Sequence, residues 1–490
     1  MKPGGEVSSF SGAAAGTVQT RCIAPIYGSE TKRSMNPHQP YGGGADSMTD
    51  SLNLVSDLIR QARAAGADAA DAVLVNGTSL SVASRQGKIE HLERSEGRDL
   101  GLRVFIGKRA AIVSSSSLDP AGFPDLVARA VAMAKVVPED KFAGFAETWA
   151  PPDTTDLDMA DPYEPSPDSL ASRAAAAEEA AFAVHGVTNS EGAEAGYGRN
   201  EVVLVTSAGF AGRRVGTSHS ISATALAGTG TDMQRDYDHH SAVYFSDLDD
   251  PAKIGKSAGE RAIARLNPTR PKTAKLPVIF DPRVAGSLLG HLMGAINGAA
   301  VARGTSFLKD KLGQRIFAAG INVHDDPRRV RGLRSRTFDG EGTPTKARAL
   351  IEDGILTTWL LESRSARQLG MTPTGHASRG TSGPPSASPS NLYLAAGTQT
   401  PAELMAGIKE GLYITEMIGM GVNGVTGDYS RGAAGFMIRD GALAEPVAEV
   451  TVAGNLLEMF AAMVPASDLV LRRGTDSPTV RVDGLTMAGG

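Results

Sequence analysis

Apolar residues recur with two periods along this chain, and the two periods occur in separate blocks. Residues 51–65 and 120–136 carry an apolar side chain every third or fourth position, which is typical of amphipathic helices. The stretch between them has a period of two and predicts turns at Asn76–Gly77 and Gln86–Gly87, with strands at 72–76, 79–86, 99–106 and 109–115. Helix, antiparallel meander and helix predict an α+β unit, because a parallel sheet would alternate strands and helices.

The same order of elements is predicted a second time. Helical patterns at 169–184 and 250–266 enclose a second meander, with strands at 201–207, 210–217, 218–227 and 232–246 and a turn at Gly216. From residue 276 the pattern is mostly that of strands, ending in a strand pair within 479–487. The predicted fold is α+β: an N-terminal helix plus antiparallel meander units, followed by a large β-rich C-terminal domain.

Changes in composition divide the 490 residues into five parts. Residues 1–47 are rich in Gly, Ser, Ala and Pro and lack a period, so we interpret them as a disordered extension or a mis-assigned start. We predict an N-terminal domain at 52–137, a linker at 138–168, a central domain at 169–270 and a C-terminal domain at 275–490.

The overall composition excludes several classes of protein. The net charge of −5 gives no general attraction for nucleic acid, so direct nucleic-acid binding is not expected. No run approaches the roughly 18–20 apolar residues that cross a membrane. The single cysteine, Cys22, cannot form an intrachain disulfide or a Cys-rich zinc site. Such poverty in cysteine fits a cytoplasmic protein and is also compatible with the periplasm.

One predicted helix, at 284–308 after a strand at 276–280, has an unusual composition. Gly286, Gly290, Gly294 and Gly298 recur every fourth residue and therefore share one side of it. Each glycine costs about 1 kcal/mol relative to alanine in a helix interior. We therefore expect another element, a partner chain or a peptide to pack very close to this backbone.

The residues alone supply no catalytic centre. His291 lies on the glycine-rich helix without a second ligand at helical spacing, and His239 and His240 are adjacent, so in a strand they point to opposite faces. His324 and His376 lie in predicted loops, the latter within the long Gly/Ser/Pro-rich loop 372–390.

Two polar segments are further candidate sites. Arg303 and Gly304–Thr305–Ser306 end a predicted helix, where the helix dipole disfavours an anion, and a turn is the preferred interpretation. Asp428 lies in the polar segment 425–432 without a partner carboxylate, which is more typical of a turn than of catalysis.

Several segments nevertheless resemble one family, and they occur in its order. These are residues 81–89 together with GLRVFIGKRAAIVSSSSL (101–118), AAVARGTSFL (299–308), the strand region 391–397, GVTGDYSRGAAGFMIRDG (424–441) and PTVRVDGLTMAGG (478–490). Together they resemble the TldD/PmbA proteins, from about residue 52 to the C-terminus.

The resemblance implies a heterodimer of two related subunits, only one of which carries the metal site. In the TldD branch the helix before Arg-Gly-Thr-Ser carries His-Glu-x-x-x-His, and a late cysteine completes the site. Alignment on Arg303–Ser306 places Leu289, Gly290 and Gly294 at those three positions, and no late cysteine is present. The chain therefore resembles the PmbA (TldE) branch, with no cofactor of its own and zinc expected in the partner subunit.

The implied function is a non-catalytic part of a cytoplasmic metallopeptidase that acts on unfolded or modified peptides. Maturation of peptide-antibiotic precursors and degradation of an antitoxin are implied tasks, and "modulator of DNA gyrase" is a historical label. The candidates for contact with the peptide or the TldD-like partner are Gly290, His291, Gly294, Arg303, Thr305 and Asp428. Addition of the peptide to an exposed sheet edge is the expected binding mode. The alternatives are an autonomous peptidase using His291, His376 or Asp428, and a homodimeric peptide-binding or regulatory protein.

Overall fold

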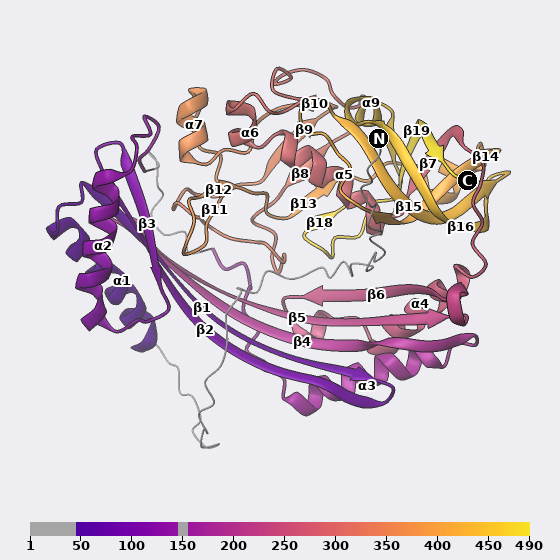
Figure 1. Ribbon diagram of the computed structural model, residues 1–490, viewed down its shortest axis with the longest axis horizontal. Coiled ribbons are helices and arrows are strands. Elements are labelled where there is room, and N and C mark those ends of the chain that lie inside the picture. Colours follow the sequence, from indigo (N-terminus) through magenta and orange to yellow (C-terminus); the bar gives the residue numbers. More distant parts are fainter. Residues whose placement is uncertain (1–45, 146–154) are drawn as a thin grey trace, which may run out of the picture. The chain divides into compact units, whose positions relative to one another are not determined.

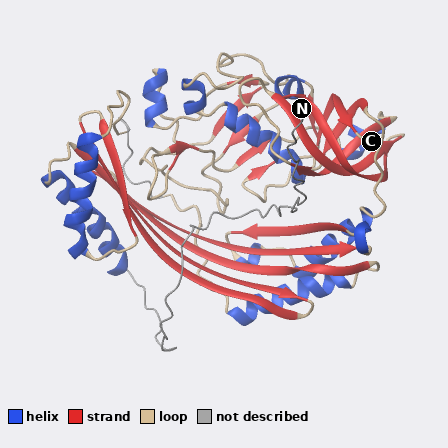
Figure 2. Cartoon of the chain, in the orientation of Figure 1, coloured by secondary structure: helices blue, strands red, loops and turns tan. Residues whose placement is uncertain are grey.

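The computed structural model describes residues 46–145 and 155–490. The extension predicted for 1–47 lies outside the described residues except for its last two positions, as does the middle of the predicted linker. Figure 1 shows the order of elements along the chain, and Figure 2 shows that strands form a large part of the described structure. The predicted α+β class is confirmed.

The first half of the chain forms one six-stranded antiparallel sheet with the order β3-β2-β1-β4-β5-β6. The two predicted meanders join in this sheet, because β1 pairs with β4. The strands are β1 (Ala69–Arg85), β2 (Lys88–Ile106), β3 (Arg109–Ser115), β4 (Val187–Thr206), β5 (Ala211–Ala227) and β6 (Gln234–Ala242).

Four helices cover one face of this sheet. Ala72 and Leu74 of β1 pack against the first two helices, and Leu80 and Val82 pack against the other two. All four residues have even numbers, so they share a face of the strand. The helices are α1 (Asp46–Ala64), α2 (Phe123–Val136), α3 (Pro167–Phe182) and α4 (Pro251–Ala264), with 3-10 turns at Pro120–Gly122, Gly230–Asp232 and Phe245–Asp247.

Two predicted turns are wrong, because both sites lie inside long strands. Asn76 pairs with Arg98 on one side and Glu201 on the other, and Gly77 is likewise paired on both sides. Gly216 similarly continues β5 opposite Asn200. A strand that is hydrogen-bonded along both edges overrides the local turn preference of Asn and Gly.

The C-terminal part is built on two further sheets and a small hairpin. One sheet has the order β16-β15-β14-β7-β19-β17, and the additional pairing of β16 with β19 closes it on itself. Its strands are β7 (Ala274–Phe280), β14 (Glu410–Ile418), β15 (Asp428–Arg439), β16 (Ala442–Asn455), β17 (Met463–Pro465) and β19 (Val480–Ala488). The predicted final strand pair at 479–487 is therefore wrong, since β19 is one continuous strand that finds its partners elsewhere.

The second C-terminal sheet has the order β10-β9-β8-β13-β18. Its strands are short, namely β8 (Val323–Asp325), β9 (Arg348–Glu352), β10 (Ile355–Leu356), β13 (Leu392–Leu394) and β18 (Thr475–Asp476), and the hairpin consists of β11 (Ala377–Ser378) and β12 (Ser386–Ala387). The accompanying helices are α5 (Pro282–Ala295), α6 (Gly298–Ala302), α7 (Ser363–Leu369), α8 (Pro401–Ala406) and α9 (Leu456–Ala461).

The helix predicted over 284–308 is interrupted after Ala295. The carbonyl of Ile296 accepts a hydrogen bond from Leu360, and the amide of Gly298 donates one to the Leu360 carbonyl. Asn297 between them caps α6 by accepting from the Ala299 amide. Backbone pairing with a distant segment thus replaces the helical bonds at this point, a competition that the local periodicity does not reveal.

Candidate functional site

Helix α5 stands at the centre of the C-terminal part. It follows the buried strand β7, and the Asp281 side chain begins it by accepting a hydrogen bond from the Arg283 amide. Its inner face joins the main hydrophobic cluster, and Leu289, which the resemblance to the TldD/PmbA proteins would align with the first histidine of the TldD motif, is 2% exposed within that cluster. An apolar side chain locked in the core supplies no ligand at this position.

The outer face of α5 is bare helix backbone. Gly290 and Gly294 are exposed, and a β-carbon added to either would meet no atom of the described chain within 4 Å. The other two glycines are packed: a β-carbon on Gly286 would lie 3.3 Å from the Thr475 carbonyl oxygen, and one on Gly298 would lie 2.5 Å from Leu361. The expectation of close packing is therefore confirmed at Gly286 and Gly298 and wrong at Gly290 and Gly294 within this chain.

His291 lies between the two bare glycines and faces strand β15. Its ring stands edge-on to the ring of Tyr429, with the centroids 5.8 Å apart and the planes at 78°. Burial, and then the positive charge of nearby Arg431, lower the pKa of His291. The imidazole is therefore neutral at pH 7.

The Arg303–Ser306 segment lies against both α5 and the loop before β15. The Ser306 hydroxyl donates to the carbonyl of Ala295 at 2.6 Å, and the amide of Phe307 donates to the carbonyl of Gly424 at 3.0 Å. Thr305 uses its hydroxyl on the Ala300 carbonyl, while Arg303 is exposed at the end of α6. The fold thus brings the RGTS segment, α5 and the DYSRG segment to one region.

Asp428 holds the turn that leads into β15. Its carboxylate accepts from the Thr426 hydroxyl at 2.6 Å and from the Asn455 amide at 3.4 Å, and its carbonyl accepts from the Asn423 amide. These are the contacts of a turn residue. In the described parts of the chain, no hydrogen bond joins the Asp428 carboxylate to a second carboxyl group that could share a catalytic role with it.

His376, the other histidine considered for catalysis, is a buried structural residue. Its ring nitrogens contact the Thr374 hydroxyl at 2.8 Å and the Asp325 carboxylate at 3.2 Å. The same carboxylate accepts from the amide and hydroxyl of Ser390. All of these side chains are inaccessible to a substrate, so the group fixes the two ends of the long loop 372–390 against β8.

The residues around α5 do not fit a zinc ion. Leu289, Gly290 and Gly294 offer no donor atom, and the guanidinium of Arg431 beside His291 disfavours a cation. Across residues 46–145 and 155–490, no group of three or more His, Cys, Asp or Glu side chains is placed to hold a metal.

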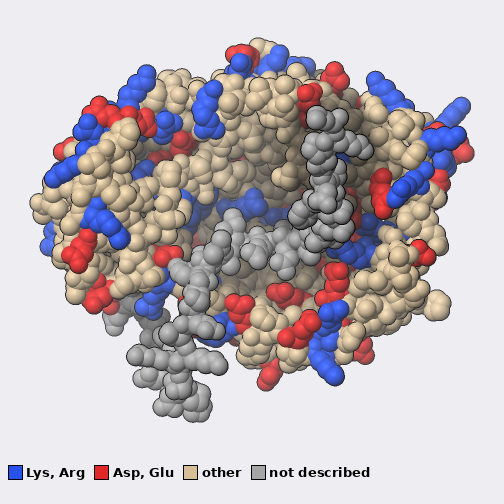
Figure 3. Space-filling view, in the orientation of Figure 1, with Lys and Arg blue, Asp and Glu red and all other residues tan. Residues whose placement is uncertain are grey.

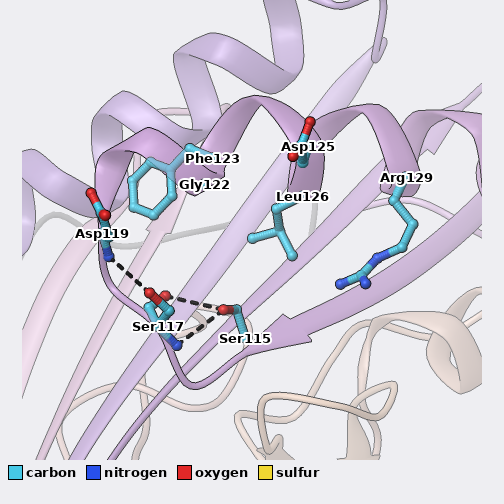
Figure 4. A pocket seen from close by; sticks show the side chains of 8 residues that line it. All are labelled: Ser115, Ser117, Asp119, Gly122, Phe123, Asp125, Leu126 and Arg129. Carbon is cyan, nitrogen blue, oxygen red and sulfur yellow. Dashed lines mark hydrogen bonds between the residues drawn. The ribbon is translucent and has the colours of Figure 1, made fainter.

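Two clefts lie away from α5. The smaller, of about 180 Å³, lies between the end of β3 and the start of α2 (Figure 4). There Ser115, Ser117 and Asp119 bond to one another, and Asp119 accepts from the Ala121 amide. Asp119 thereby caps the 3-10 turn Pro120–Gly122 that precedes α2.

The larger cleft, of about 690 Å³, includes His240, Arg329, Val470 and Arg472 among its lining residues. Arg472 donates to the His239 carbonyl of β6, and Arg261 donates to the Tyr237 carbonyl of the same strand. Two carbonyls on this outer edge of the sheet are therefore already occupied. On the face drawn in Figure 3, basic and acidic side chains are interspersed.

Three family models match consecutive parts of the chain. They are described as PmbA/TldA metallopeptidase domain 1 at residues 70–134, central domain at 160–266 and C-terminal domain at 273–489. The chain is also 36% identical over 425 residues to Metalloprotease PmbA of Escherichia coli O157:H7, covering 86% of this chain and 92% of that protein. This chain belongs to the PmbA/TldD family.

Other members agree in sequence and fold. A Metalloprotease PmbA homolog of Haemophilus influenzae is 33% identical over 440 residues, covering 89% of this chain and 95% of the homolog. A Bacteroides thetaiotaomicron crystal structure described as a modulator of DNA gyrase matches with a TM-score of 0.82 at 26% identity, covering 90% and 99% of the two chains. TldE from Thermococcus kodakarensis shares the fold, with a TM-score of 0.79 at 20% identity and coverage of 89% and 100%.

Within this PmbA/TldD chain, the sequence located the central helix but missed the side chains that surround His291. Tyr429 and Arg431 lie in the family segment DYSRG, and Ser287 lies one helical turn before His291. Tyr429 and Arg431 are two residues apart in a strand, and Ser287 and His291 are four apart in a helix, so the members of each pair lie on one face. This spacing is the sequence signal from which the two pairs could have been identified. The contact between the two pairs required the tertiary structure.

Proposed function

We propose that this chain is a PmbA/TldE-like, non-catalytic subunit of a heterodimeric metallopeptidase. The observation that carries the proposal is the state of α5, where the three positions of the family's metal motif hold a buried leucine and two bare glycines beside an arginine. Zinc is held by a TldD-like partner that carries His-Glu-x-x-x-His, and this chain contributes surface that binds the peptide.

The proposed substrates are unfolded or modified peptides in the cytoplasm, as in precursor maturation or antitoxin degradation. Among the described residues, no helix has the length and apolar character needed to cross a membrane. The exposed α5 backbone supports the proposal, because a peptide or partner segment can approach it without displacing a side chain. Gly290, His291, Gly294, Arg303, Thr305 and Asp428 remain the candidates for these contacts.

We further propose strand addition at residues 88–98 of β2 as a means of holding peptide backbone. Every residue of this segment is exposed, and β3 pairs only with Leu100–Ile106 of the same strand. In contrast, Arg261 and Arg472 cap carbonyls on the β6 edge. Peptide binding is expected to slow amide hydrogen exchange in 88–98, whereas unchanged exchange there would reject this binding mode.

Reconstitution tests the function. The full chain is mixed with its HExxxH-bearing relative from the same organism, and cleavage of an unstructured peptide is measured. Activity is expected only in the mixture, and it should vanish when the relative loses its histidines. Activity of this chain alone, together with one tightly bound zinc per chain that a chelator removes, would instead establish an autonomous peptidase. Failure of the two chains to co-purify would favour a homodimeric peptide-binding protein.

A further inference from the structure

Two side chains of α5 and two of β15 carry buried polar atoms without a hydrogen bond of normal geometry in the described chain. The atoms are Ser287 Oγ, His291 Nε2, Tyr429 OH and Arg431 Nε, although the Arg431 side chain does interact with the Tyr429 hydroxyl. Ser287 and His291 share a face of α5, Tyr429 and Arg431 share a face of β15, and the His291–Tyr429 contact joins the two pairs. Buried polar groups normally find partners, so this concentration indicates a missing ligand.

Each of the four groups can donate a hydrogen bond, and Arg431 can only donate. The Tyr429 side chain is almost completely buried, at 2% exposure, and Arg431 lies beside its hydroxyl. Arg431 makes no ion pair with any acidic residue in the described ranges, and the adjacent Asp428 is occupied by Thr426 and Asn455. A guanidinium carries five N–H donors and no acceptor, and it recognises a carboxylate through two parallel hydrogen bonds.

The four atoms are covered in this structure, and the exposed α5 backbone beside them is the side from which a ligand would reach them. Gly290 and Gly294 flank His291 and leave the helix backbone accessible. The end of β14 and the loop that follows it, which pairs with the start of β15, expose three apolar side chains, with Ile418 at 55%, Met420 at 86% and Val425 at 56%. A short peptide could therefore place apolar side chains on this loop while its end reaches the donors.

We propose that Ser287, His291, Tyr429 and Arg431 form a subsite that binds the C-terminal carboxylate of a peptide on α5. The assignment rests on the proposed function in taking a peptide as the ligand. A main-chain carbonyl has one oxygen, whereas a terminal carboxylate has two oxygens and a full negative charge, which match several donors and an unpaired guanidinium. The place of the family's metal ligands would thus serve peptide anchoring in this chain.

Calorimetric titration of the full-length chain tests the subsite. The ligands are N-acetyl-trialanine, its C-terminal amide, and an N-acetylated, C-amidated Ala-Asp-Ala peptide. We expect the free acid to bind about tenfold or more tightly than both amides, as expected for loss of charge-assisted hydrogen bonds. Equal affinity of acid and amide overturns the proposal, and strong binding of the internal aspartate overturns its restriction to a chain end.

Variants tie the preference to these residues. Arg431→Met is expected to abolish the difference between acid and amide. Arg439→Met is the matched control on the same strand, because Arg439 pairs with Glu410 and Glu445, and it should retain the difference. Tyr429→Phe should lower affinity for the acid about threefold to tenfold, as for one hydrogen bond, at an unchanged unfolding midpoint. Retention of the preference in Arg431→Met and Tyr429→Phe contradicts the assignment even if one variant folds poorly.

The subsite and the proposed function fail in different ways. An acid preference in a chain that supports no peptidase activity with its relative would reject the function and keep the subsite. Activity in the mixture without any acid preference would reject the subsite and keep the function.

Discussion

The ring of His291 contacts the ring of Tyr429 edge-on, with 5.8 Å between centroids, and so couples the bare helix α5 to strand β15. An edge-to-face aromatic contact of this kind contributes about 0.5–1.5 kcal/mol beyond its burial. The contact fixes His291 beside Arg431, where a neutral imidazole can donate a hydrogen bond but no second ligand completes a metal site. The surroundings of His291 therefore support the proposed role in peptide binding over a role as a metal ligand.

Replacing His291 by alanine should separate binding from catalysis. In the reconstituted mixture we expect kcat to change less than about twofold, because the proposed chemistry belongs to the partner, while KM for short free-acid peptides rises several-fold as one hydrogen bond is lost. Steady-state kinetics with acid and amide substrates measures both. A kcat loss of about 100-fold, typical of a removed general acid or base, would return His291 to a catalytic role.

The four glycines of the 286–298 stripe should respond differently to alanine. Gly290→Ala should raise the free energy of unfolding by about 1 kcal/mol, since the new β-carbon meets no described atom and alanine favours the helix. Gly298→Ala is the matched opposite and should cost about 1–3 kcal/mol, because its β-carbon would overlap Leu361, Ser365 and the Leu360 carbonyl. Urea unfolding measures both.

The same Gly290→Ala variant tests why a costly glycine stands there. If a peptide or partner approaches the helix backbone, the variant should be more stable yet less active in the reconstituted mixture. Full activity at increased stability would show that nothing approaches α5 at this position.

The buried pair of Asp71 and Arg379 should hold the C-terminal region on the first sheet. Both side chains are 1% exposed, and Arg103 also binds Asp71, with its Nε 3.0 Å from the carboxylate. Arg379→Met should lower the free energy of unfolding by about 3 kcal/mol, since it removes one partner of a buried pair. Arg60→Met, in an exposed pair with Asp57, is the control and should cost about 0.5 kcal/mol or less.

The pH dependence of this pair follows from Asp71. Burial alone would raise the pKa of Asp71, but Arg103 and Arg379 outweigh it and lower the pKa below the ordinary value of about 3.9. The pair therefore stabilises the fold above about pH 4, and its contribution is lost as the pH falls further. In Arg379→Met the loss of stability on acidification should begin at a higher pH than in the wild type, because the pKa of Asp71 is lowered less. Urea unfolding midpoints that fall in parallel with pH for the variant and the wild type would contradict this coupling.

Asp339 should have the opposite dependence. Burial and the neighbouring Glu341 raise the pKa of Asp339 to about 6, although the amides of Glu341, Thr343 and Ala377 donate to it. The folded state then binds more protons than the unfolded state between about pH 4 and 6, so stability falls as the pH rises through this window. Two pKa units correspond to about 2–3 kcal/mol.

Asp339→Asn removes this titration. Urea unfolding at pH 4.5 and 7.5 should show a smaller loss of stability toward pH 7.5 in the variant than in the wild type. Asp57→Asn, at an exposed carboxylate, should leave the wild-type difference intact. A variant with the full wild-type loss would show that Asp339 is ionised throughout the range.

Residue identity and local periodicity determined a definite part of this protein. The apolar spacing in α1, α2 and α4 predicted these helices because each buries one face whatever its neighbours are. Leu289, Gly290 and Gly294 carry no metal-binding side chain, so the prediction that this helix holds no metal could be made from residue identity alone. The ordered family segments then indicated the fold without any knowledge of packing.

Contacts between distant segments determined the rest, because their free energy appears only when the chain has folded. Asn76 and Gly77 lie in a continuous strand since both edges of β1 are paired, and Asn297 breaks a helix since Leu360 pairs with its neighbours. Nothing local to α5 showed that Gly290 faces open space while Gly298 is packed. The meeting of His291 with Tyr429 and Arg431 depends on the pairing of β14 with both β7, which precedes α5, and β15. Strands β14 and β15 lie more than 120 residues from β7 in sequence, and the proposed carboxylate subsite depends on the same pairing.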